Sequence, residues 1–408
     1  MNETRADASA SARNLIVEAL GVYTAARGVG LLVLFIAEDR LNRLHAVLPQ
    51  KFRTWNQLLV RWDGIYYQNI VTRGYPRVLP TDVHGNVLQN SWAFFPVFPL
   101  VTGLLMRVTG LSFATAAFII NLAAGAGAAV VLALVVRRVA NDATALRAVA
   151  FWMFLPTAFV LQVPYSEAIY VLVVSTLFLL LLRGQFGLAA GLLMLSGLCR
   201  GYVLPLSAAA AAAVAEYGWA TRQHAAREGR TPPGWLRIIV DNQAAGWLLV
   251  AAIAAPFLWM AVAGLVTGRP DAYKLTQQAW GYALDPVLWL ERWPSTLRTV
   301  GDSIVATTAL IVLAFSVALT LKGLALRIPL AFKAYMVVAT LLLFALALPE
   351  SVPIGSLPRF AFGVITAPIV MALLVRRTWM VVAVVVGFTL LQYWWVLNVW
   401  SGRAGVAP

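Results

Sequence analysis

Apolar runs separated by short polar segments make up most of the chain after residue 14. A helix of about 20 consecutive apolar residues crosses a bilayer. Runs that approach this length predict membrane helices at 14–36, 94–108, 112–136, 245–266, 304–321, 328–348, 360–375 and 379–399. The pattern therefore predicts an all-α polytopic membrane protein, with about 10–12 helices in a single domain over residues 1–408.

Four further apolar segments are short: 151–163, 169–182, 186–198 and 203–214. Helices of this length reach only about 18–24 Å at 1.5 Å per residue, less than the hydrocarbon core of about 30 Å. We expect them to surround a water-filled cavity or to re-enter the membrane, rather than all to cross it.

Three polar segments interrupt the apolar pattern. Segment 216–243 is basic, so the positive-inside rule places it in the cytosol. Segments 38–91 and 267–300 are predicted as the first and second outer loops. Within the first, aromatic and aliphatic side chains recur at helical spacing and predict one interfacial amphipathic helix; they are Phe52, Trp55, Leu59, Trp62, Tyr66 and Ile70.

Charge leaves two topologies open. If 94–108 and 112–136 both cross, Arg137 and Arg138 lie outside, against the positive-inside rule. If one of them re-enters, these arginines lie inside, and segment 165–167 emerges on the side of Asp63. We prefer the second arrangement.

Composition supports the membrane interpretation and narrows the chemistry. The chain is 61% hydrophobic and 12% charged, against about 25% charged in a soluble domain. Its net charge of +14 is assigned mainly to cytosolic loops, and the remainder to an anionic lipid phosphate, rather than to nucleic acid.

The single Cys199 excludes an internal disulfide, and the three scattered histidines (His45, His84 and His224) predict no metal site. Residues 1–11 are polar and acidic, unlike a signal peptide.

Asp63 is the first candidate for chemistry. It lies among tryptophans and tyrosines in segment 61–67, at the edge of the aromatic stripe, where water, lipid and a lipid head group would meet. Ordering a polar segment of about 50 residues is costly, which favours a function. The alternative is a carboxylate held in a salt bridge with Arg61 or Arg73.

Segment 163–167 and Arg200 form a second group of candidates. Ser166 and Glu167 are typical of the start of a helix, as cap and first-turn acid; beside Tyr165, the same helix start could instead bind phosphate or sugar hydroxyls. Arg200 lies between two short apolar segments and needs an anionic partner, which is either Glu167 or a lipid phosphate.

Two more candidates lie further along the chain. Segment 273–281 contains Gln277 and Trp280, a composition common where sugars stack, although a solvated loop with interfacial aromatics would look the same. Arg359 lies at the mouth of a predicted span, where it either snorkels or meets a substrate. No signature of ATP, NAD or zinc chemistry occurs in the sequence.

Several of these segments together resemble the PIG-V family, the GPI mannosyltransferase 2-like proteins of the GT-C superfamily. The resemblance covers roughly residues 15–400, and the matching segments occur in the family's order. They are Arg61-Trp62-Asp63 with Arg73-Gly74-Tyr75, Phe94-Phe95-Pro96-Val97-Phe98-Pro99, Pro164-Tyr165-Ser166-Glu167, Arg200-Gly201 and Leu357-Pro358-Arg359-Phe360.

The resemblance implies a GT-C type fold whose active site faces the non-cytosolic side. It implies transfer of mannose, with inversion, from a polyprenyl-phosphate donor to a lipid-linked or glycan acceptor, and it maps the general base of the first outer loop onto Asp63. Substrate contacts are expected from Trp62, Tyr66, Tyr165, Ser166, Glu167, Arg200, Gln277, Trp280 and Arg359, with no metal or cofactor. The family's Arg-Ser-Asn-Gly-like stretch is here Arg200-Gly201-Tyr202, a departure that affects contacts at that point.

The Ala/Val-rich, basic composition looks like that of a high-GC bacterium, so the expected location is a bacterial cell membrane and the eukaryotic acceptor is not carried over. Two other functions stay open: a transporter or flippase of polyprenyl-linked sugars, and a non-catalytic partner subunit of the same fold. Polar residues gathered in loops on one face favour the transferase.

Overall fold

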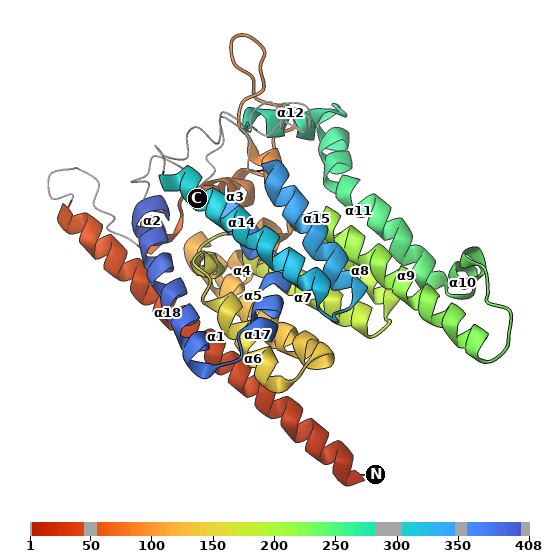
Figure 1. Cartoon of the computed structure of the whole chain (residues 1–408). Coiled ribbons are helices and arrows are strands. Elements are labelled where there is room, and N and C mark those ends of the chain that lie inside the picture. The colour runs from red at the N-terminus through yellow and green to blue at the C-terminus, as the bar shows by residue number, and fades with distance from the viewer. Residues whose placement is uncertain (1, 45–54, 282–303, 347–356, 401–408) are drawn as a thin grey trace.

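The structure is a computed structural model that describes residues 2–44, 55–281, 304–346 and 357–400 (Figure 1). Its helices are α1 (Asn2–Leu44), α2 (Trp55–Leu59), α3 (Asp63–Arg73), α4 (Val97–Thr109), α5 (Phe113–Val139), α6 (Asp142–Met153), α7 (Glu167–Leu182), α8 (Phe186–Ser196), α9 (Leu204–Arg227), α10 (Trp235–Asp241), α11 (Gln243–Thr267), α12 (Ala272–Ala279), α14 (Ile304–Ala325), α15 (Leu330–Leu346), α16 (Leu357–Phe362), α17 (Thr366–Leu374) and α18 (Thr378–Trp395). Two short 3₁₀ helices, η1 (Ser91–Ala93) and η2 (Ala158–Leu161), and a π-helix, η5 (Val396–Trp400), complete the described helices. The expectation of an all-α protein is confirmed.

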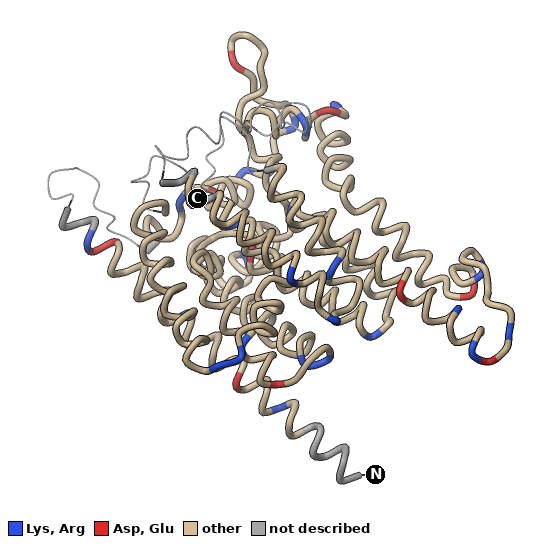
Figure 2. Tube along the Cα trace, viewed as in Figure 1, with Lys and Arg blue, Asp and Glu red and all other residues tan. Residues whose placement is uncertain are grey.

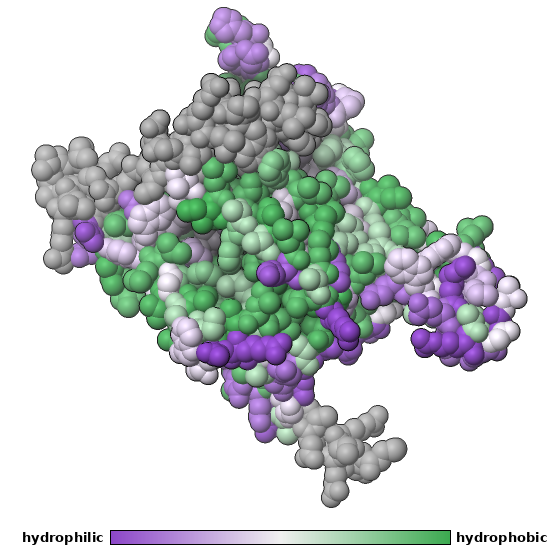
Figure 3. All heavy atoms as spheres, in the orientation of Figure 1, coloured by the Kyte–Doolittle hydropathy of each residue, from purple (hydrophilic) through white to green (hydrophobic). Residues whose placement is uncertain are grey.

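Among the described residues, four helical stretches are long and apolar enough to cross a bilayer: Ala10–Arg40, Phe113–Val139, Gln243–Thr267 and Thr378–Trp400. Five shorter apolar helices accompany them in the same part of the chain. Apolar side chains cover the middle of the molecule, while hydrophilic ones gather at its ends (Figure 3). The chain is an integral membrane protein.

The two ends of the helix bundle differ in the elements they carry. The short helices α2, α3 and α12 lie at the upper end in Figure 1, together with a projecting loop of the segment between α3 and α4. Basic residues line the lower edge of the bundle (Figure 2), where the connection between α17 and α18 carries Arg376 and Arg377. This arrangement agrees with an assignment of the basic connections to one face.

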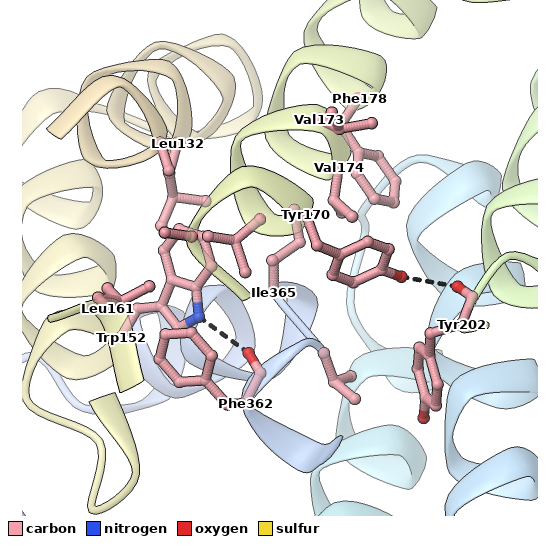
Figure 4. Packing of buried hydrophobic residues seen from close by; sticks show 14 of the residues in the cluster. Leu132, Trp152, Leu161, Tyr170, Val173, Val174, Phe178, Tyr202, Phe362 and Ile365 are labelled. Carbon is pink, nitrogen blue, oxygen red and sulfur yellow. Dashed lines mark hydrogen bonds between the residues drawn. The ribbon is translucent and has the colours of Figure 1, made fainter. Parts of the chain in front are cut away.

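Buried aromatic side chains join helices that are distant in the sequence. Trp152 of α6 stacks on Phe362 of α16 at 5.6 Å between ring centroids, and its indole Nε1 donates to the carbonyl of Phe362 (3.0 Å) (Figure 4). Tyr170 of α7 donates its hydroxyl to the carbonyl of Tyr202 (2.6 Å). Because buried polar groups are costly unless they are hydrogen-bonded, the first bond fixes how α6 meets α16, and the second fixes how α7 meets the segment ahead of α9.

Helices α8 and α11 pack closely at Gly197. A Cβ placed there would lie 2.4 Å from the carbonyl oxygen of Ala255, a backbone atom that cannot move aside alone. We expect Gly197→Ala to destabilise the protein by about 1–3 kcal/mol, since the two helices must separate. Gly191→Ala, on the same helix with nothing within 4 Å of its Cβ, is the matched control. Thermal unfolding of both variants in detergent measures the difference, and equal midpoints would contradict the packing argument.

Several elements differ from the sequence-based expectation; the predicted span 360–375, for example, is two short helices, α16 and α17. The predicted single amphipathic helix of the first outer loop is two helices, α2 and α3, that are separated at Trp62; Phe52 lies outside the described residues. Segment 151–163 is mostly turn and the short η2, because helix α6 begins earlier and ends at Met153. Much of the polar segment 216–243 is helical, since α9 continues to Arg227 and α10 follows. Parts of the second outer loop and the segment 347–356 also lie outside the described residues.

Candidate active site

Four charged side chains from four separate parts of the chain form one continuous row. Arg359 Nη1 donates to Asp63 Oδ2, and Arg359 Nε lies 3.3 Å from Glu167 Oε1. Arg200 Nη1 lies 2.9 Å from the same Glu167 oxygen. We call Asp63, Arg359, Glu167 and Arg200 the charge row. Positive and negative groups alternate along it, so each carboxylate has at least one guanidinium partner.

The members of the charge row differ in exposure. The side chains of Glu167 and Arg359 are 3% and 6% exposed, whereas that of Asp63 is 21% exposed. Arg200 lies between them at 14%. Asp63 and Arg200 are therefore the ends of the row that a ligand can reach, and the Glu167–Arg359 contact is its buried centre.

Asp63 is placed by the start of α3. The helix begins at this residue, and the carboxylate sits in its first turn, where the positive end of the helix dipole favours a negative charge. The preceding Trp62 anchors the chain because its indole Nε1 donates to the carbonyl of Trp400 (2.9 Å). Asp63 thus stands where α3 meets the end of the last described helix.

Glu167 is placed by the start of α7, as the sequence predicted from its helix-start pattern. Ser166 accepts a hydrogen bond from the hydroxyl of Tyr67 (2.9 Å) and another from Arg200 (3.3 Å). Asn121 of α5 donates to the backbone carbonyl of Tyr165 (3.0 Å). Tyr67 and Asn121 were not among the predicted site residues; Asn121, an amide within a long apolar run, is the kind of residue that could have been noted.

Two aromatic rings pack against the guanidinium of Arg359. Its guanidinium carbon lies 4.8 Å from the ring centroid of Tyr165 and 5.4 Å from that of Phe360. Burial alone would lower the pKa of Arg359, but the carboxylates of Asp63 and Glu167 outweigh burial and raise the pKa above its ordinary value. Arg359 therefore stays charged, and it is a buried partner of two carboxylates rather than a snorkelling side chain.

An aromatic surface adjoins Asp63 on α3. Tyr66 stacks on Phe94 at 4.7 Å between centroids, and Trp280 meets Tyr66 edge-on at 5.0 Å. Burial, and secondarily the charge of Asp63, raises the pKa of Tyr66, which keeps its hydroxyl protonated. In the described part of the chain, no hydrogen bond or ring contact joins Gln277 to the charge row. Its neighbour Thr276 instead bonds Asn90 (3.1 Å from Asn90 Nδ2), a pair that the sequence did not suggest.

The geometry decides between several of the alternatives. Asp63 is salt-bridged, but with Arg359; Arg61 instead pairs with Glu38 at 2.7 Å. The protein partner of Arg200 is Glu167. The contact between Tyr67 and Ser166 brings the start of α7 against α3, the helix that begins at Asp63. No group of three or more potential metal ligands occurs among the residues that the structure describes.

Comparison with known proteins identifies several solved structures of similar helical arrangement, of which two are described here. One is ArnT from Cupriavidus metallidurans bound to undecaprenyl phosphate (TM-score 0.47, 14% identity, covering 88% of this chain and 62% of that one). The other is the Archaeoglobus fulgidus oligosaccharyltransferase in complex with zinc and sulfate (TM-score 0.42, 13% identity, covering 92% and 53%). The chain thus spans less than two thirds of either protein. At TM-scores below 0.5, these likenesses do not decide the fold or the activity of this chain.

No family profile and no curated protein matches the sequence. Membership of the PIG-V family therefore remains an expectation from the sequence motifs.

Proposed function

We propose that this chain is a GT-C type, PIG-V-like membrane glycosyltransferase. It moves mannose from a polyprenyl-phosphate donor to a lipid-linked or glycan acceptor at the outer face of a bacterial cell membrane. The observation that carries the proposal is the charge row: a partly exposed carboxylate at the end of a membrane helix bundle, fixed by a buried arginine and followed by a second arginine.

The proposed reaction uses each end of the row differently. Asp63 accepts the proton of an acceptor hydroxyl while the oxygen of that hydroxyl forms a bond to the anomeric carbon of the sugar. The bond from that carbon to the phosphate oxygen breaks on the opposite face, so the configuration inverts. The polyprenyl phosphate leaves with the electron pair. Arg200, at the reachable end of the row, stabilises its negative charge, and Arg359 adds positive charge from the buried centre.

The surroundings of Asp63 suit a sugar. Tyr66 and Trp280 present aromatic surface beside the carboxylate, and such surface packs against the apolar faces of sugar rings. Trp62, Tyr165 and Ser166 hold the neighbouring backbone and Arg359 in place. In this proposal Gln277 contributes from α12 only if the helix moves toward bound substrate, because it has no described contact with the charge row.

The test is transfer of sugar from synthetic polyprenyl-phosphate mannose to membrane lipid extracts by the purified protein. A mannosylated lipid formed by wild type and not by Asp63→Asn supports the proposal. Movement of the intact donor across a vesicle bilayer without any glycosylated product would identify a transporter. Absence of both activities across several polyprenyl-phosphate sugars would identify a non-catalytic subunit.

A further inference from the structure

The chain just before Asp63 adopts a backbone conformation that its sequence disfavours. Trp62 has φ 52° and ψ −121°, the only positive φ at a non-glycine residue in the described part of the chain. The amide of Gly64 donates to the carbonyl of Arg61 (2.9 Å), which closes a four-residue turn over residues 61–64. These angles match the second position of a type II′ turn, near +60° and about −120°, which glycine normally fills.

A bulky aromatic residue keeps such a conformation only when its surroundings impose it. Three contacts surround the turn. Asp63 bonds Arg359, the Trp62 indole bonds the carbonyl of Trp400, and Arg61 pairs with Glu38 of α1 at 2.7 Å. The first contact belongs to the charge row, and the second holds the side chain of Trp62. The third holds the backbone at the start of the turn.

We infer that Glu38 is a positioning residue for Asp63, acting through Arg61. The Glu38 and Arg61 side chains are 7% and 9% exposed, so their ion pair is shielded from water and fixes the start of the turn relative to α1. The turn leads directly into α3 at Asp63. Without the pair, Trp62 relaxes toward negative φ and carries the carboxylate away from its place beside Arg359. This inference rests on the proposed function of Asp63.

The first test is Glu38→Gln, with Arg61→Lys as a second variant that keeps the positive charge and loses the planar guanidinium. We expect kcat for sugar transfer to fall about 10- to 100-fold because the base is misplaced, with KM changed by less than about 2-fold. Hydrogen exchange of a peptide that covers residues 60–67 should quicken, since the amides of Gly64 and Ile65 are bonded within the turn. Asp142→Asn is the matched control, because it removes the carboxylate of the more exposed Arg137–Asp142 pair.

The second test repeats Glu38→Gln in a Trp62→Gly background. Glycine adopts the turn without help, so Glu38 should matter less there: we expect the same substitution to change kcat by less than about 3-fold, a clear departure from additivity. If Glu38→Gln lowers kcat equally in the wild-type and Trp62→Gly backgrounds, the cause is general destabilisation and the inference is overturned. It is also overturned if Glu38→Gln changes neither kcat nor the hydrogen exchange of residues 60–67. If wild type transfers no sugar at all, the proposed function fails, and exchange over residues 60–67 alone decides whether Glu38 holds the turn.

Discussion

Asp63→Asn is expected to abolish sugar transfer while the protein stays folded. Positioned general bases contribute about 10²- to 10⁴-fold, so kcat should fall by that amount or more. The substitution is near-isosteric, and the asparagine oxygen can still accept from Arg359. Arg359 also keeps its second carboxylate, Glu167, at 3.3 Å, so no guanidinium is left without an anionic partner. Initial rates with a polyprenyl-phosphate sugar measure the loss of transfer, and the thermal unfolding midpoint measures whether the protein stays folded.

Asp82→Asn is the matched control for this substitution. Asp82 lies in the same polar segment, but on an exposed turn where its carboxylate accepts from the amides of His84 and Asn86. Its loss should leave the transfer rate unchanged. A folded Asp63→Asn variant with wild-type activity would remove Asp63 from the mechanism. An Asp63→Asn variant that fails to fold would show that the carboxylate is structural.

The sequence predicted all four members of the charge row for one physical reason. Ionisable residues beside or within apolar segments are costly, so those that persist are candidates for function. Asp63, Glu167, Arg200 and Arg359 were recognised in this way before any geometry was known. The structure adds that they meet, although Asp63 and Arg359 are 296 positions apart in the chain.

The pairings within the site could not be read from the sequence, because they depend on how distant helices pack. Nearness in the chain suggested Arg61 or Arg73 as the partner of Asp63, yet α1 brings Glu38 to Arg61, and α16 brings Arg359 to Asp63. The conformation of Trp62 was likewise unpredictable, since a regular helical spacing of aromatics favours one continuous helix. Tertiary contacts overrode that local preference.

The helix boundaries that differed have local causes. Segment 151–163 is mostly apolar, but it includes Pro156 and ends just before Pro164, and proline interrupts helices. The polar end of α9 was assigned to a loop on hydropathy, although alanine, arginine and glutamine are good helix formers. Hydropathy identifies where a chain meets lipid and says less about where a helix continues into water.

Glu167→Gln is expected to destabilise the protein far more than any other single change in the charge row. One oxygen of this carboxylate contacts both Arg200 and Arg359, and its side chain is 3% exposed. Removing one partner from a buried ion pair typically costs about 3–5 kcal/mol, because the remaining charge is left without compensation. Here Arg359 would keep its ion pair with Asp63, but Arg200 would be left without a carboxylate in the row.

The unfolding midpoint of Glu167→Gln, followed by tryptophan fluorescence in detergent, should therefore fall well below that of Asp142→Asn. The Arg137–Asp142 pair is 27% and 41% exposed, and exposed pairs contribute about 0–1 kcal/mol. A second substitution tests the cause. Arg200→Met in the Glu167→Gln background removes the guanidinium that has lost its carboxylate, so it should recover part of the lost stability. If the double variant is less stable than Glu167→Gln alone, the hydrogen bond of Arg200 to Ser166 contributes more than its charge costs, and the argument from uncompensated charge fails.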